Sequence, residues 1–92
     1  MENKYDVKVR QNQILNSTEN STEIKQGWYI DLVKYNIEDD YQYEVNRITV
    51  ATTINEDEIQ NIIEEVTYIA INAIALERFV NPSTVRKMFI KH

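Results

Sequence analysis

Residues that commonly carry out nucleophilic or acid–base chemistry are scarce in this 92-residue sequence. It has no cysteine and one histidine, His92, which is the last residue. Nucleophilic catalysis needs a hydroxyl or thiol beside a base that is held in place, and chain ends are often poorly ordered. The sequence therefore predicts neither a catalytic triad nor an enzyme. Paired carboxylates are the alternative source of an acid and a base, and this alternative stays open from sequence alone.

Ligands for metals and cofactors are equally few. One histidine without cysteines does not complete a tetrahedral zinc site. The acidic runs at 38–40 and 56–58 lack the spaced acids and the sharp-turn glycine of a calcium loop. A single glycine, Gly27, also excludes a glycine-rich phosphate-binding loop. We therefore predict no metal site and no cofactor.

The charge is unevenly distributed along the chain, whose formal net charge is -5. All fifteen acidic residues lie within 1–77, whereas residues 78–92 hold four basic residues and no acid. Nucleic-acid binding depends on neutralising phosphates with lysine and arginine. An acidic body with a short basic end repels phosphates, so we do not expect direct nucleic-acid binding.

The composition, with 42% hydrophobic and 27% charged residues, is typical of a globular chain, and its length predicts a single domain over 1–92. The longest apolar runs, YIAI among them, are far shorter than the roughly 20 residues that cross a bilayer, and no signal-like segment begins the chain. We expect a cytoplasmic protein without a membrane partner.

The alternation of apolar and polar residues predicts three strands. They cover about 4–15, 27–36 and 41–53, and the polar repeat NSTENSTE at 16–23 is predicted to be a mobile loop. In the second strand, Trp28, Ile30 and Leu32 share one face. In the third, the apolar parity switches at Asn46 and Arg47, which predicts either a β-bulge or a strand that changes what it packs against.

A long helix is predicted at about 56–80, followed by a short helix at about 82–90. Asn55 is the expected N-cap, with Glu58 returning a hydrogen bond to the cap amide. At 100° per residue one apolar stripe, expected to cover the sheet, consists of Ile59, Ile62, Ile63, Val66, Ile69, Ala70, Ala73, Ile74, Leu76 and Val80. The fold class is thus α+β: a three-stranded antiparallel sheet packed by one long helix, with a short C-terminal helix.

A second apolar stripe lies on the other side of the predicted long helix. It consists of Tyr68, Ile71, Ala75 and Phe79. Three alternatives follow from it: the C-terminal segment folds back over the stripe, the stripe packs against its symmetry mates in a homodimer, or it forms a groove for a different protein.

Glu77 falls within the main stripe by angle, where an unpaired carboxylate would cost several kcal/mol. It is either a functional acid or a residue beyond the edge of the sheet, solvated or paired with Arg47 or Arg86. We favour the second interpretation.

Tyrosines and acids gather on the predicted strands. The group comprises Asp31, Glu38, Asp39, Asp40, Glu44, Tyr29, Tyr35, Tyr41 and Tyr43. Tyrosine offers a large contact area with a polar tip and is enriched at protein interfaces. Either these tyrosines border the core, or they form an acidic docking face for a basic protein, such as one whose groove binds nucleic acid.

In size, acidity and lack of catalytic residues the chain is similar to small phage and mobile-element proteins that inhibit host machinery, anti-CRISPR proteins among them. This resemblance in composition implies a protein-binding inhibitor or decoy that acts in the host cytoplasm through the acidic face. The alternative function is a homodimeric structural or assembly protein that uses the apolar helix stripe.

Overall fold

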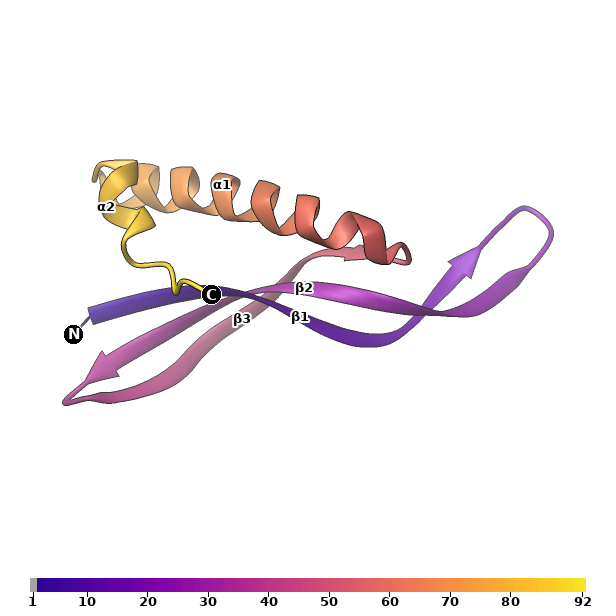
Figure 1. Ribbon diagram of the computed structural model, residues 1–92, viewed down its shortest axis with the longest axis horizontal. Coiled ribbons are helices and arrows are strands. Elements are labelled where there is room, and N and C mark those ends of the chain that lie inside the picture. The colour runs from indigo at the N-terminus through magenta and orange to yellow at the C-terminus, as the bar shows by residue number, and fades with distance from the viewer. Residues whose placement is uncertain (1) are drawn as a thin grey trace.

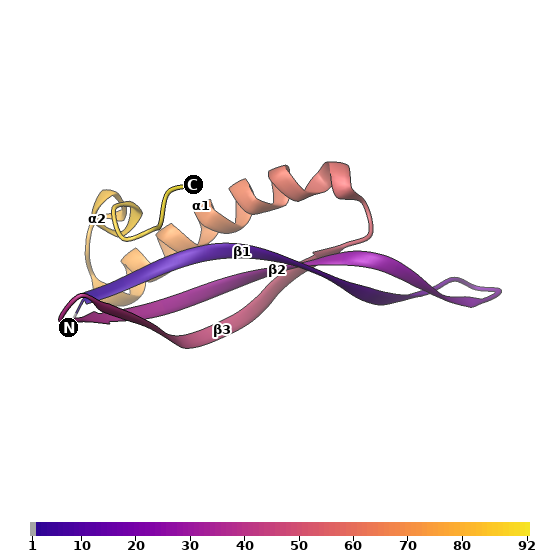
Figure 2. The ribbon, with the colours of Figure 1, turned by 60° about the horizontal axis from the view of Figure 1, so that its bottom comes forward.

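The computed structural model describes residues 2–92 and shows three strands followed by the helices (Figure 1). The elements are β1 (Glu2–Ser17), β2 (Thr22–Glu38), β3 (Tyr41–Thr53), the 3-10 turn η1 (Glu56–Glu58), α1 (Ile59–Arg78) and α2 (Pro82–Arg86). The strands form one antiparallel sheet in the order β1-β2-β3. Because α1 lies over one face of this sheet (Figure 2), the predicted α+β architecture is confirmed.

The β1–β2 hairpin is longer than the sequence predicted. Its two strands pair without interruption from Glu2 and Ile37 to Ser17 and Thr22. The repeat expected to form an eight-residue loop therefore supplies the ends of both strands, and only residues 18–21 turn. Backbone pairing requires no apolar side chain, which is why the polar composition of the repeat did not end the strands.

The outer half of this hairpin projects as a two-stranded arm beyond the rest of the molecule (Figure 1). β3 pairs with β2 only from Trp28 onward, so residues 12–27 have no third strand beside them. Gly27 lies in this arm, and a Cβ placed there would clash with the side chain of Ile14. The glycine therefore allows the Ile14 side chain to lie across the neighbouring strand.

The β2–β3 hairpin turns at Asp39 and Asp40, whose φ angles are 50° and 66°. Two consecutive left-handed residues form the tight turn whose twist suits a hairpin, and aspartate tolerates this conformation. Register shifts leave Val45 and Val50 of β3 without a partner on β2. The predicted β-bulge is confirmed at Val45, beside Asn46, and Val50 forms a second.

The start of α1 differs in detail from the predicted capping box. Oδ1 of Asn55 accepts a hydrogen bond from the amide of Asp57 at 3.0 Å, as an N-cap should. Glu58 does not return the bond to Asn55: its carboxylate accepts from the hydroxyl of Thr53 at 3.0 Å, and the Asn55 amide donates to that same hydroxyl oxygen. Thr53, at the end of β3, thus accepts the hydrogen bond from the Asn55 amide that Glu58 was expected to accept.

The end of α1 is unusual because Phe79 adopts a left-handed backbone, with φ 55° and ψ 42°. Val80 donates its amide hydrogen to the carbonyl of Ala75 at 3.0 Å, and Phe79 donates to Leu76 at 3.3 Å. Such helix ends normally use glycine, since a bulky residue with positive φ is strained. The helix ends at Arg78, two residues before the predicted end.

The C-terminal segment folds back onto β1 (Figure 2). α2 is shorter than predicted because the chain leaves the helix to run beside the edge strand. Tyr5 donates its amide to the carbonyl of Met88 at 2.9 Å, and Ile90 donates to the carbonyl of Tyr5 at 2.8 Å. The rings of Tyr5 and Phe89 stack with centroids 5.4 Å apart. These contacts hold the segment after α2 against the edge strand β1.

One flank of α1 is covered by α2. Ile71 and Ala75 of α1 form a buried cluster with Val85 of α2, against which Phe89 packs. The intramolecular alternative for the second apolar stripe is thus confirmed at Ile71 and Ala75.

The stripe expected to cover the sheet is only partly buried. Ala70 is buried, whereas Ile69 and Leu76 are 64% and 76% exposed. The prediction was wrong for these two residues, and for Ala73 and Val80, which are also exposed, because it treated the sheet as the sole neighbour of the helix. With α2 packed beside it, α1 is turned so that Ala70, Ile71 and Ala75 form its buried side.

Candidate functional site

The predicted acidic face does not form a single surface. Leu32 borders two hollows with α1 residues, so strand alternation directs Asp31 and Tyr35 away from the helix. Both are buried there, with Asp31 only 1% exposed. A buried carboxylate is not available to a basic partner.

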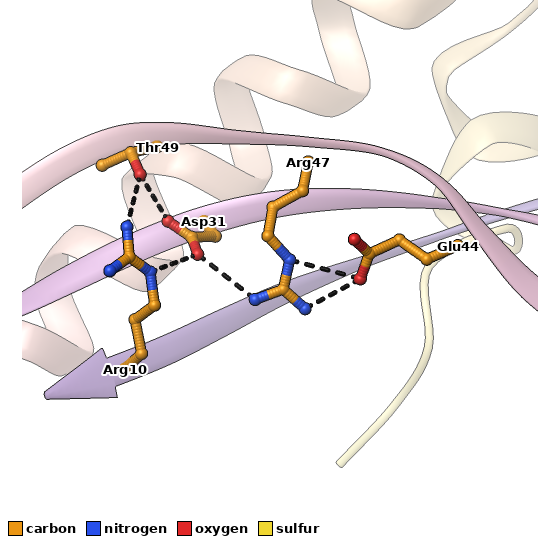
Figure 3. A network of polar contacts seen from close by, with 5 residues as sticks. All are labelled: Arg10, Asp31, Glu44, Arg47 and Thr49. Carbon is orange, nitrogen blue, oxygen red and sulfur yellow. Dashed lines mark hydrogen bonds and ion pairs between the residues drawn. The ribbon is translucent and has the colours of Figure 1, made fainter.

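Asp31 of β2 is held by side chains from the two neighbouring strands, β1 and β3 (Figure 3). Its Oδ2 accepts from Nε of Arg10 at 2.8 Å and lies 3.4 Å from Nη1 of Arg47. Its Oδ1 accepts from the hydroxyl of Thr49 at 2.7 Å. Arg47 also donates to Oε1 of Glu44 from Nη2 at 2.9 Å. The network thus joins two carboxylates of the predicted face to two arginines.

These contacts set the ionisation of the network. Burial acts to raise the pKa of Asp31, but the hydrogen bonds from Thr49 and Arg10 outweigh it, and the pKa lies below its ordinary value. The hydrogen bond to Glu44 raises the pKa of Arg47. Asp31 is therefore charged at neutral pH, and its charge is compensated within the sheet.

The tyrosines beside Asp31 are covered by cations. The Arg10 guanidinium lies 4.4 Å from the ring centroid of Tyr29, and the Lys8 ammonium lies 5.5 Å from that of Tyr35. Val33, on the same face, is fully buried although no helix packs above it. We call this face of the sheet the open face, and its centre consists of compensated ion pairs rather than exposed acid.

The exposed part of the predicted face is the tip of the β2–β3 hairpin. Glu38, Asp39 and Asp40 are all exposed there and take part in no ion pair among residues 2–92. The rings of Tyr41 and Tyr43 stack beside them with centroids 5.8 Å apart, and Tyr41 is 68% exposed. The predicted acidic and aromatic surface is thus reduced to this tip.

The residues predicted for self-association are divided by the fold. Ile71 and Ala75 are buried beneath α2 and cannot contact another molecule in this conformation. Tyr68 and Phe79 remain exposed, at 65% and 92%. Self-association stays a prediction, but the surface available for it differs from the one predicted.

Part of the apolar surface of α1 is left uncovered by α2, and we call it the outer flank. It consists of Ile69, Ala73, Leu76, Phe79 and Val80, all of them exposed. At its C-terminal end Phe79 and Val80 line a hollow with Ala75 and with Pro82 of α2. Between α1 and β3 the sheet side of this flank is hollowed into an apolar groove of about 280 Å³. The groove is lined by Leu32, Val50, Val66, Ile69, Ala70 and Ala73.

The remaining candidates for chemistry are Glu77 and His92. Glu77 is exposed at the border of a hollow that Lys34 also lines, and it forms no ion pair within residues 2–92. The solvated interpretation of Glu77 therefore holds, without the arginine partner considered for it. His92, although it is the last residue, is in contact with β1: its Nε2 lies 2.6 Å from Oδ1 of Asp6. The nearby hydroxyl of Thr67 donates to the carbonyl of Ile63 and is not directed at this pair.

Over the described residues 2–92, no group of three or more histidine, cysteine or acidic side chains is arranged to hold a metal ion. Nor does that part of the chain contain a helix of the length and apolar character that spanning a bilayer requires. No family model matches the chain, and its comparison with curated proteins and with solved structures gave no match.

Proposed function

We propose that the protein is a non-enzymatic protein-binding module whose partner covers the outer flank of α1. The observation that carries this proposal is Phe79, whose side chain is 92% exposed while its backbone is left-handed. A residue in this conformation costs about 1 kcal/mol or more relative to glycine. A phenyl ring in water recovers none of that cost, whereas a ring buried by a partner does.

The neighbours of Phe79 support the same function. Leu76 and Ile69 continue the exposed apolar surface along α1, and the groove toward β3 continues it onto the sheet. Single exposed apolar residues are ordinary on protein surfaces, but contiguous ones mark sites of interaction. The outer flank thus has the composition of an interface.

The test exploits the strain at Phe79. Phe79→Gly is expected to raise the stability of the isolated chain by about 1 kcal/mol and to abolish partner binding. Quantitative mass spectrometry of proteins captured by the immobilised wild type and variant measures binding, with the protein's own copies counted among the captured chains. Tyr41→Ser, which removes another exposed aromatic ring far along the chain, is the matched control. Unchanged capture by Phe79→Gly would refute the proposal.

A second candidate function rests on the hairpin tip. Three carboxylates that form no ion pair within residues 2–92 lie beside two stacked tyrosines, and together they form a compact acidic projection that fits a basic protein surface. In this function the protein is an acidic inhibitor or decoy, as phage and mobile-element anti-defence proteins are, acting in the cytoplasm on a nucleic-acid-binding protein.

Charge-neutral replacements test the tip without disturbing the fold. The triple variant Glu38→Gln, Asp39→Asn, Asp40→Asn keeps the shapes of the side chains, and asparagine tolerates the left-handed turn. Loss of a captured basic protein, together with steep loss of wild-type capture between 50 and 500 mM salt, is expected for a decoy. Equal capture by the triple variant would count against it.

A further inference from the structure

The outer edge of β1 is open to a further strand along most of its length. β1 and β3 are the two edge strands, because the sheet has the order β1-β2-β3. β3 carries bulges at Val45 and Val50, and bulges are one means by which an edge avoids further pairing. β1 instead pairs with β2 in unbroken register as far as Ser17, and the projecting arm carries this edge beyond the body of the molecule (Figure 1). The edge of β1 is therefore the one suited to extension of the sheet.

The C-terminal segment shows which residues of β1 direct their backbone groups toward this edge. Tyr5 donates its amide hydrogen to the carbonyl of Met88, and its own carbonyl accepts from the amide of Ile90. In an antiparallel strand the backbone groups that point away from the paired neighbour recur at every second residue. Four further residues with the parity of Tyr5 make up what we call the edge row: Val9, Gln11, Gln13 and Leu15. Within residues 2–92, the C-terminal segment makes no backbone hydrogen bond to β1 beyond Tyr5, so it leaves the edge row uncovered.

Gln13 confirms the outward direction of the edge row. Its amide donates to Oδ1 of Asn12 at 2.8 Å, and its carbonyl accepts from the hydroxyl of Tyr29 at 3.2 Å. Both bonds lie at the surface, where a pairing strand can replace them. Within residues 2–92, no side chain forms such a bond to the backbone of the other three residues of the row. The row thus presents regularly spaced donors and acceptors to which an extended strand can add.

The side chains of the edge row complement those of a second copy of the same strand. If two copies of β1 pair antiparallel about Asn12, Val9 of each copy lies opposite Leu15 of the other. Val9 is 39% exposed and Leu15 is 69% exposed, so each gains an apolar neighbour. Gln11 of each copy then lies opposite Gln13 of the other. Pairing about Gln13 would instead place Leu15 opposite Gln11, so the match of side chains favours Asn12 as the centre.

The contact between Val9 and Leu15 continues an apolar row across both sheets. On β2 of the same chain, Leu15 is paired with Ile24, which is 66% exposed, and Val9 is paired with Ile30. Ile30 and Leu32 have the same parity, so this row lies on the face of the sheet that α1 covers. Each Leu15 would thus lie between Ile24 of its own chain and Val9 of the other copy.

The distribution of charge does not oppose this pairing. No charged residue and no proline lies between Arg10 and Glu19, so the edge lacks two of the features by which natural edge strands avoid pairing. In a pair centred on Asn12, Arg10 lies opposite Ile14 of the other copy, and Lys8 lies opposite Asn16. No two like charges therefore meet directly across the contact.

We infer that two copies of this chain join at the β1 edge as an antiparallel pair centred on Asn12, which unites their two sheets into one. The edge rows of the two copies exchange backbone hydrogen bonds, and Val9 and Leu15 supply the apolar contact. The contact is two-fold and self-complementary, so it closes as a dimer. This surface is separate from the outer flank of α1, and the inference goes beyond the proposed function without depending on it.

Two double variants test the pairing and its register. Gln11 and Gln13 are exposed, and each lies opposite the other across the two-fold axis of the proposed dimer. Gln11→Lys with Gln13→Lys places lysine opposite lysine and is expected to give a folded monomer, whereas Gln11→Glu with Gln13→Lys places opposite charges together and is expected to remain a dimer, as is the wild type. Light scattering at low salt over a wide range of concentrations measures the mass, and circular dichroism confirms folding. Because both variants replace the same two side chains, a difference in mass cannot be ascribed to their removal.

A proline variant tests the backbone hydrogen bonds. The amide of Gln11 points to the open edge, so Gln11→Pro removes a donor from the proposed contact and none from the pairing of β1 with β2. This variant is expected to be a folded monomer. Phe79→Gly, which tests the proposed function, is expected to remain a dimer because Phe79 lies outside this contact.

Disulfide trapping tests the geometry, because the chain has no native cysteine. Asn12 meets its own copy as a non-hydrogen-bonded pair, in which the two Cα atoms lie about 4.5 Å apart, a separation that a disulfide can span. Asn12→Cys is therefore expected to crosslink to itself upon mild oxidation. Ser17→Cys, exposed on the same strand but distant from the two-fold axis, is the control and is expected to stay uncrosslinked.

Each other result overturns the inference. A wild type that is monomeric at all concentrations would refute the dimer, and equal masses for the two double variants would refute the pairing about Asn12. Crosslinking of Gln13→Cys in place of Asn12→Cys would assign a different register. A dimer that is lost in Phe79→Gly would move the contact to the outer flank. None of the first three results bears on the proposed function, which is tested by Phe79-dependent capture.

Discussion

Two surfaces of this molecule have no layer of secondary structure above them, and they are built differently. On the open face of the sheet, Val33 is fully buried and Asp31 is 1% exposed. On the outer flank of α1, Leu76 is 76% exposed and Phe79 is 92% exposed. The first surface covers itself with its own side chains, whereas the second does not.

On the open face, long cationic side chains cover the tyrosine rings. Arg10 lies over Tyr29 and also donates to Asp31, and Lys8 lies over Tyr35. Long cationic side chains thus bury apolar area with their stems while their charges stay in water or in ion pairs. The outer flank has no such residue between Glu65 and Glu77. The contrast supports the proposal that the outer flank is an interface.

The largest expected effect is a difference in stability between two alanine variants, one on each flank of α1. Ile71 is 3% exposed beneath α2, and Ile69, two residues away, is 64% exposed. Ile71→Ala is expected to lower the free energy of unfolding by about 3 kcal/mol, because it leaves a cavity. Ile69→Ala is expected to change it by less than about 0.5 kcal/mol in dilute protein, where association does not contribute.

Urea denaturation of both variants at the same low concentration measures this difference. If both variants lose the same free energy of unfolding, the outer flank is packed within the monomer. The distinction between the flank covered by α2 and the outer flank would then be wrong.

The second expected effect concerns the ion-pair network of the open face. Asp31→Ala removes the acceptor of the Arg10 and Thr49 hydrogen bonds and leaves two arginines close together. We expect a loss of about 2 kcal/mol, since hydrogen bonds to charged groups contribute about 1.5–3 kcal/mol and part of this network is exposed. Thermal unfolding measures the loss. The control Glu23→Ala, which removes an exposed ion pair with Lys25, is expected to cost almost nothing.

The same carboxylate predicts a response to acid. Because the folded-state pKa of Asp31 lies below its ordinary value of 3.8, the unfolded chain binds this proton more readily than the folded chain. The stabilisation from the charged group is therefore complete above about pH 5 and is lost as the pH falls through the folded-state pKa. The stability difference between the wild type and Asp31→Asn should shrink between pH 5 and pH 2. A difference that is constant over this range would show that the charge of Asp31 is not stabilising.

Much of the fold could be predicted because backbone geometry translates directly into sequence pattern. Alternation in β2 identified its two faces, and the change of parity near Asn46 identified a bulge. The repeat NSTENSTE was misassigned because pairing of the backbone at Ser17 and Thr22 leaves no apolar signal. The cap at Asn55 was predicted, but the role of Thr53 was not, because its hydroxyl contacts depend on how β3 joins the helix.

The candidate site was less predictable because exposure depends on neighbours distant in sequence. The pattern of α1 showed two apolar stripes but not which one α2 would cover. Asp31 was assigned to an acidic surface because its distance from Arg10 and Thr49 is set by register across three strands. A signal for the outer flank was nevertheless present: the seven-residue spacing of Ile62, Ile69 and Leu76 within a stretch free of charge.

The smallest expected effect tests whether long side chains cover the open face. Lys8 forms no ion pair among residues 2–92, so its effect on stability must come from contact with Tyr35. Lys8→Ala is expected to lower the midpoint of unfolding through the lost cation–π contact and the exposure of apolar area beneath its stem. Lys25→Ala, on the projecting arm, is the control and is expected to cost less than about 0.3 kcal/mol.

Chemical denaturation in 0.1 and 1 M salt then separates the two contributions of Lys8. The part due to charge should weaken in high salt, whereas the part due to coverage by the stem should persist or grow. If Lys8→Ala costs no more than Lys25→Ala, the cations of the open face are not a covering layer. The open face would then no longer differ from the outer flank in how its apolar area is covered. The proposal that the outer flank is an interface would depend on the strain and exposure of Phe79 alone.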